Sequence, residues 1–259
     1  LLMNKVIVAG WCARGLTILS SFIITRLLIN LVGGDGLAAH SILFSLTAWF
    51  SLMNLGLPIA VQNAVSRLRG NGINYNDYLG YSYGSMLIIT ICLAPVVITL
   101  SLFAKMTLFS DYAFISTYSI IISCLIIFVS GQGQLFIQVM FAEHKAIWPN
   151  IYPAFCSVIS LFSLLLFSYY DINNFNLIII VLCTINFLPS FHAVIKLRAL
   201  SFITINIAKT ISLIAEARGL LLFAFFSAIT LSVDYIIMSQ ILNPSEIVKY
   251  SLISKLFNV

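Results

Sequence analysis

Apolar side chains occupy this 259-residue chain in long blocks rather than in short alternating runs. A block of about 20 apolar residues crosses a bilayer as a helix, whereas the strands of a transmembrane barrel are shorter and alternate. The pattern therefore predicts an all-α, polytopic transmembrane helix bundle. We expect spans near residues 6–30, 39–62, 79–104, 113–141, 149–168, 175–197 and 219–242, and an eighth that begins near residue 247.

Segment 198–218 departs from this pattern because it mixes isoleucine and leucine with charged side chains, namely Arg198, Lys209, Glu216 and Arg218. Such a segment is typical of an amphipathic helix that lies in the membrane interface. It divides the chain into an N-terminal lobe of six helices (1–197), a cytoplasmic interfacial linker (198–218) and the start of a second lobe (219–259).

The eighth predicted helix covers residues 247–259, about 20 Å at the standard helix rise. A bilayer core needs about 30 Å, so we expect the intact protein to continue and to complete a two-lobe transporter. A shift of 210 residues places the turn at 30–36 on the turn at 240–246, with similar hydropathy and almost no identity. That is the pattern of parallel structural repeats.

Composition and charge agree with a membrane protein. The chain is 61% hydrophobic and 8% charged, against about 25% charged in soluble domains. With the N-terminus in the cytoplasm, Lys105 alone lies in an outer loop, and the other loop cations lie inside, which is the positive-inside pattern. The inside residues are Lys5, Arg67, Arg69, Lys145, Lys196, Arg198, Lys209 and Arg218. The positive-inside pattern therefore accounts for the net charge of +5, and we expect no nucleic-acid partner.

Motifs for enzyme chemistry, cofactors and metals are missing from the sequence. The cysteines and histidines have no metal-ligand spacing. The Gly131–Gly133 pair lacks the third glycine of a dinucleotide loop, and no phosphate-binding loop or HExxH motif occurs. We expect no cofactor, no metal site and no catalytic residue.

Polar residues inside the first span are candidates for function, because ionisable groups in a membrane helix are costly. Arg14, Thr17, Ser21 and Thr25 follow spacings of three, four and four, so they share one helix face. Arg26 lies twelve residues beyond Arg14, about 120° around the helix. One interpretation is a cavity in which a guanidinium binds phosphate; the other is that the arginines snorkel to headgroups.

Two further candidates lie in later spans. Asn54 shares a face with Thr47, Ser51 and Pro58, as a cavity lining or as ordinary contact between helices. Asp234 lies well inside the span at 219–242. It is a candidate for ion coupling or for pairing with an arginine, or a structural carboxylate held by hydroxyl groups.

Two stretches resemble a known family. The first runs from Thr25 to Leu37 (TRLLINLVGGDGL) and continues in Asn54–Pro58 (NLGLP) and Asn63–Arg67 (NAVSR); the second is Asp234–Ile237 with Asn243–Tyr250. Both are similar to the lobe starts of Wzx-type polysaccharide (O-antigen) flippases, in the superfamily that also holds multidrug exporters and lipid II flippases. Gly33 follows Val32 where many members have Leu-Gly-Pro.

The resemblance implies a bacterial inner-membrane protein of 12 to 14 helices, arranged as two lobes around a central cavity. Members move an undecaprenyl-pyrophosphate-linked oligosaccharide to the periplasmic leaflet by alternating access. The implied partners are this lipid-linked substrate, membrane lipids and other polysaccharide-assembly membrane proteins. A multidrug exporter of the same superfamily and a membrane polysaccharide polymerase are the alternatives.

Overall fold

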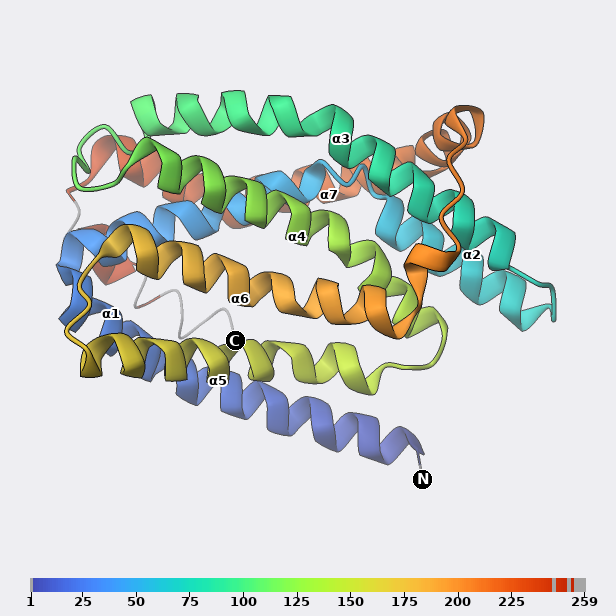
Figure 1. Ribbon diagram of the computed structural model, residues 1–259, viewed down its shortest axis with the longest axis horizontal. Coiled ribbons are helices and arrows are strands. Elements are labelled where there is room, and N and C mark those ends of the chain that lie inside the picture. The colour runs from blue at the N-terminus through green and yellow to red at the C-terminus, as the bar shows by residue number, and fades with distance from the viewer. Residues whose placement is uncertain (1, 244–245, 251–252, 254–259) are drawn as a thin grey trace.

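The computed structural model describes residues 2–243, 246–250 and 253, and its described part is a bundle of α-helices (Figure 1). The elements are α1 (Leu2–Leu52), α2 (Leu57–Gly70), α3 (Asn76–Thr107), α4 (Thr117–Ala142), α5 (Ile147–Tyr169), α6 (Phe175–Lys196), the 3-10 helix η1 (Ala199–Ser201) and α7 (Ile207–Ile241). Six of these helices are long and apolar enough to cross a membrane. The predicted all-α, polytopic membrane fold is confirmed.

Helix α1 contains the first predicted span and the first part of the second, because the chain reverses at Gly33 (Figure 1). Gly33 has φ 75° and ψ −179°, a conformation that costs little only for glycine. The first half of α1, residues 2–32, runs away from the N-terminus, and the second half, residues 34–52, returns. The described helices therefore provide seven passes. Residues 246–250 are helical, and the rest of the predicted eighth helix lies outside the described residues.

The predicted span at 39–62 is wrong as one continuous helix, because the chain unwinds between Leu52 and Leu57. Pro58 has no N–H and its ring would collide with the carbonyl of Asn54 in an unbroken helix. That carbonyl instead accepts from the Leu57 amide at 3.1 Å. The Asn54 side-chain oxygen accepts from the amide of Gly56 at 3.0 Å, and Gly56 takes a left-handed conformation with φ 72°.

The predicted boundary between a linker and a new helix at 218/219 is also wrong, since α7 begins at Ile207 and continues without a break. Thr210, Leu213 and Ala217 are buried at spacings of three and four, and the Thr210 hydroxyl lies 2.9 Å from that of Ser85 on α3. Ile207 on the same helix is 68% exposed. The segment is amphipathic as predicted, but its apolar side packs on α2 and α3. It therefore forms the first part of α7 and not a separate helix.

Residues 202–206, which we call the strap, connect η1 to α7 and lie along α3. The Thr204 amide donates to the Gly80 carbonyl at 3.0 Å. A Cβ at Gly80 would lie 2.5 Å from the Phe202 carbonyl oxygen, and one at Gly84 would overlap the carbonyl of Thr204. Only glycine permits this backbone-to-backbone approach, so the two glycines fix where the strap lies.

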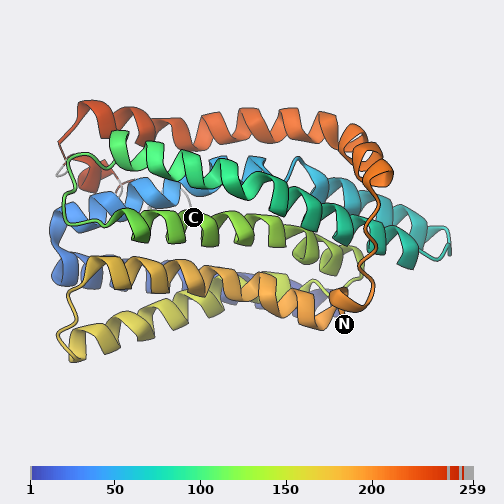
Figure 2. The same cartoon turned by 45° about the horizontal axis from the view of Figure 1, so that its top comes forward.

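Helices α3 and α7 are longer than a bilayer requires. Their 32 and 35 residues give about 48 and 52 Å at 1.5 Å per residue, against a hydrocarbon core of about 30 Å. The two run side by side (Figure 2), and together with α2 they extend beyond α5 and α6 at one end of the bundle. A buried cluster that includes Leu57, Leu79 and Leu213 holds this extension together.

This end, which we call the basic end, carries the N-terminus and the connections 70–76, 142–147 and 196–207 (Figure 1). The predicted inside-facing cations lie in or near these segments except Arg218, which lies further along α7, between the residues that approach Gly56. Lys105, near the opposite end, donates to the carbonyls of Phe109 (3.3 Å) and Tyr112 (3.2 Å). The Lys105 ammonium therefore stabilises the loop that follows α3.

We expect reporter fusions at Asn71 and Lys145 to be cytoplasmic and fusions at Asp35 and Asp171 to be periplasmic. The reason is that the basic end should stay inside while the opposite end is translocated. Paired alkaline phosphatase and fluorescent-protein fusions measure the side. If Asp35 and Asn71 reported the same side, the reversal at Gly33 would not separate two passes.

Candidate functional site

A groove between the first half of α1 and α5 is the main candidate site. It consists of two adjoining pockets of about 640 and 920 Å³. Both are lined by Thr17, Ser21, Pro149 and Pro153, so the two pockets adjoin along these residues. We call the smaller one the polar pocket and the larger one the Arg14 pocket.

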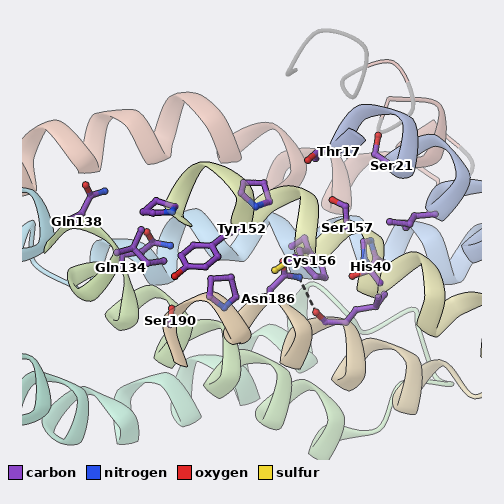
Figure 3. Close-up of a pocket in the computed structure, with 18 of the residues that line it drawn as sticks. Thr17, Ser21, His40, Gln134, Gln138, Tyr152, Cys156, Ser157, Asn186 and Ser190 are labelled. Atoms are coloured by element: carbon purple, nitrogen blue, oxygen red, sulfur yellow. Dashed lines mark hydrogen bonds between the residues drawn. The ribbon is translucent and has the colours of Figure 1, made fainter. Parts of the chain in front are cut away.

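The polar pocket lies between α1, α4, α5 and α6 (Figure 3). About half of its lining residues carry polar side chains. The polar lining residues are Thr17, Ser21, His40, Gln134, Gln138, Tyr152, Ser157, Ser160, Asn186 and Ser190.

Prolines help to shape the polar pocket. Pro153 and Pro189 lie inside α5 and α6 and line the pocket, and a proline inside a helix frees the carbonyl four residues earlier. For Pro189 that carbonyl belongs to Ile185, and it accepts from the thiol of Cys156 on α5 at 3.4 Å. The proline thus gives α5 and α6 a polar contact at the floor of the pocket.

Tyr152 connects the polar pocket to a histidine. Its hydroxyl lies 2.7 Å from Nδ1 of His192 and 3.5 Å from the sulfur of Met140. The indole of Trp148 packs on the His192 ring with centroids 4.9 Å apart, and the ammonium of Lys196 lies 5.5 Å from the Trp148 ring. These contacts hold Tyr152 in one orientation at the end of the pocket nearest the basic end.

The Arg14 pocket contains the guanidinium that the sequence indicated. Arg14 is exposed and lies 5.9 Å from the ring of Trp11, and both residues line the pocket. Thr17 and Ser21 follow on the same face. The predicted stripe thus reaches the groove through Arg14, Thr17 and Ser21. Thr25 is buried and donates to the carbonyl of Ser21 at 2.8 Å, and it lines neither pocket.

The other predicted residues lie away from this groove. Arg26 is exposed outside both pockets, and Asn54 stabilises the break between α1 and α2. Asp234 is exposed on α7 and accepts from the hydroxyl of Tyr250 at 2.8 Å. Helices α5 and α7 lie on opposite sides of the bundle (Figure 2). The structure therefore does not bring Asp234 to Arg14.

Sequence reasoning missed the lining that α4 and α6 provide. Gln134 and Gln138 are four residues apart on α4, as are Asn186 and Ser190 on α6. Amides that recur at this spacing in apolar helices share one face, and that signal could have identified them. His40 and Tyr152 carried no such signal, because only the packing of the helices brings them to the pocket.

The groove is equipped for binding. It offers one guanidinium beside many neutral hydrogen-bonding groups, and neither pocket is lined by a carboxylate from the described residues. Within the same part of the chain, no three His, Cys, Asp or Glu side chains come together as a metal site would require.

Comparison with curated proteins finds similarity along nearly the whole chain. It is 28% identical over 264 residues to the "Putative O-antigen export protein" of Yersinia pseudotuberculosis, with 97% of this chain and 60% of that protein covered. It is 26% identical over 268 residues to the "Putative O-antigen transporter" of Salmonella typhi, covering 99% of this chain and 59% of that protein. The protein of the same name from Salmonella typhimurium is 25% identical over 267 residues. The chain thus spans about 60% of the length of these relatives. No protein-family model matches it.

Proposed function

We propose that this chain belongs with the Wzx-type O-antigen transporters, in line with the names of its relatives. On this basis, it is the cargo-binding part of a lipid-linked oligosaccharide flippase. The cargo is an undecaprenyl-pyrophosphate-linked oligosaccharide, which crosses the bacterial inner membrane from the cytoplasmic to the periplasmic leaflet. The N-terminus and the basic end are cytoplasmic, and transport proceeds by alternating access between two lobes. Protein partners are other membrane proteins of polysaccharide assembly.

The observation that carries this proposal is the composition of the α1–α5 groove. Its Arg14 pocket presents a guanidinium, whose planar donors match phosphate oxygens in a bidentate manner. The polar pocket beside it offers hydroxyl and amide groups that suit sugar hydroxyls. A pyrophosphate joined directly to an oligosaccharide needs these two environments side by side within a membrane.

The same groove argues against export of organic cations. A cationic cargo needs a carboxylate or an open aromatic face to replace its hydration. The described lining contains no carboxylate, and the Trp11 ring in the Arg14 pocket already lies beside the guanidinium of Arg14, which would repel a cation. Asp234 remains a candidate for ion coupling on the far side of the bundle, where Tyr250 contacts it.

Deletion of the gene from its host is expected to remove O-antigen from the cell surface while lipid-linked repeat units accumulate in the inner membrane. Gel electrophoresis of lipopolysaccharide and mass spectrometry of extracted lipids measure the two effects, and the reintroduced gene is the control. Loss of a polymerase would instead leave single repeat units at the surface. That outcome, or unchanged O-antigen, would contradict a flippase.

A further inference from the structure

We infer that the polar pocket is a subsite for uncharged sugars and that it discriminates against sugars that carry a carboxylate. This inference rests on the proposed function, because it assigns the glycan of the cargo to one pocket and its pyrophosphate to the other. It depends on which hydrogen-bonding atoms of the pocket are already in use.

Four side chains of the lining each commit a donor within the bundle. Thr17 donates to the carbonyl of Ala13 at 2.9 Å, and Ser21 donates to that of Ile18 at 2.7 Å. On α6, the Asn186 amide nitrogen donates to Leu182 at 2.9 Å, as the dashed line in Figure 3 shows. Ser190 donates to Ser130 on α4 at 3.2 Å. The oxygens of these four side chains therefore remain as acceptors.

Gln134 and Gln138 supply the complementary groups. Neither makes a side-chain hydrogen bond to another described residue, and both line the pocket from one face of α4 (Figure 3). A primary amide offers two N–H donors and one carbonyl acceptor. The pocket thus combines several fixed acceptors with two adaptable amides.

A sugar hydroxyl is both a donor and an acceptor, so it satisfies the fixed acceptors and also accepts from the glutamines. A carboxylate is an acceptor only, and it would face the lone pairs of Thr17 and Ser21, whose hydroxyl protons are already in use. No Lys or Arg of the described chain lines the polar pocket. A buried anion without a cation is costly, and Arg14 in the adjoining pocket is occupied by the pyrophosphate.

The aromatic side chains of the pocket fit the same assignment. His40 stacks on Phe44 with ring centroids 4.4 Å apart, and Tyr152 is buried against α4 and α6. Rings of this kind pack against the C–H faces of a pyranose.

Binding of three synthetic probes to the purified protein in lipid nanodiscs tests this inference. The probes are a short-chain polyprenyl pyrophosphate without sugar, its glucosyl derivative and its glucuronosyl derivative, all measured at pH 8 by calorimetry. We expect the glucosyl probe to bind at least about tenfold more tightly than the glucuronosyl probe, a difference of about 1.4 kcal/mol. Equal binding of the two, or tighter binding of the acidic probe, would overturn the inference.

Gln138→Lys places a cation in the polar pocket. It should reduce or reverse the preference for the glucosyl probe over the glucuronosyl probe. Gln62→Lys is the matched control, because Gln62 lies on α2 and lines neither pocket, and it should leave the preference unchanged. If Gln138→Lys does not fold, Gln134→Leu replaces it: removal of an amide should weaken the glucosyl probe about tenfold and leave the sugar-free probe unaffected. An unchanged preference in a folded Gln138→Lys protein, or unchanged glucosyl binding in Gln134→Leu, contradicts the assignment.

The sugar-free probe separates this inference from the proposed function. If it binds as tightly as the glucosyl probe, the sugar subsite is wrong while a pyrophosphate-dependent carrier stands. If none of the three probes binds to folded protein, the proposed function fails as well.

Discussion

Gly84→Ala is expected to destabilise the bundle by more than about 3 kcal/mol, at the upper end of overpacking substitutions. The added Cβ would overlap the Thr204 carbonyl oxygen and lie 2.7 Å from its carbon. Both are backbone atoms of the strap, which cannot move aside as a flexible side chain can. The helix propensity of alanine favours the change by about 1 kcal/mol, so the clash decides the sign.

Gly219→Ala is the matched control. Gly219 lies within α7, and a Cβ there meets no atom within 4 Å. The substitution should be neutral or stabilise by up to about 1 kcal/mol. Thermal unfolding of the purified proteins in detergent, followed by tryptophan fluorescence, measures both. A Gly84→Ala protein as stable as the unmodified chain would show that the strap is not pressed against α3.

Arg14→Ala is expected to abolish transport, as a surface O-antigen assay would show. A charge-assisted hydrogen bond contributes roughly 1.5–3 kcal/mol, so its loss weakens binding of the pyrophosphate by about ten- to a hundredfold. Arg14→Lys should restore transport only in part, because an ammonium lacks the planar bidentate geometry of a guanidinium. A residue that only snorkels would be replaced fully by lysine.

Arg26→Ala is the matched control for Arg14, because Arg26 is on the same helix but lies outside the groove. It should retain most activity at normal membrane levels, which immunoblotting of each variant establishes. Full activity of Arg14→Ala at normal levels would remove Arg14 from the site. It would also remove the main physical reason for an anionic cargo.

The spans could be predicted because each one is a long apolar block, and the reversal at Gly33 because a cluster of glycines marks the turn. The break before Pro58 was harder to place. A proline in a membrane helix causes anything from a mild kink to a full interruption, and the outcome depends on the neighbours. Here Gly56 lets α7 approach so closely that an added Cβ would lie 2.9 Å from the Leu221 amide nitrogen, and no local pattern contains that contact.

The sequence could not predict that α7 begins at Ile207 and continues without a break, for a related reason. An amphipathic segment looks the same whether its apolar side faces lipid or packs on another helix. Burial of Leu213 and Ala217 depends on α2 and α3, which are more than a hundred residues away in sequence.

The candidate groove was predicted in part. The face that carries Arg14, Thr17 and Ser21 follows from helical spacing alone, and the structure places those three residues together in the groove. Spacing could not show that Thr25 would be buried or that Arg26 would lie outside the groove, since both depend on where α5 crosses α1. The amides of α4 and α6 were visible in the sequence, but only the packing shows that they face the same cavity.

The strap has a mechanical consequence for the connection between α6 and α7. A linker that hangs free can absorb a rotation of the next helix by changing its own dihedral angles. Residues 202–206 cannot change their dihedral angles in this way without breaking the Thr204–Gly80 hydrogen bond. They would also have to move away from the α3 backbone, which they contact closely at the two glycines. Any rotation of the later part of α7 relative to α3 must therefore bend α7 itself. The strap holds the start of α7 in place, and the flexibility that such a rotation needs lies further along α7.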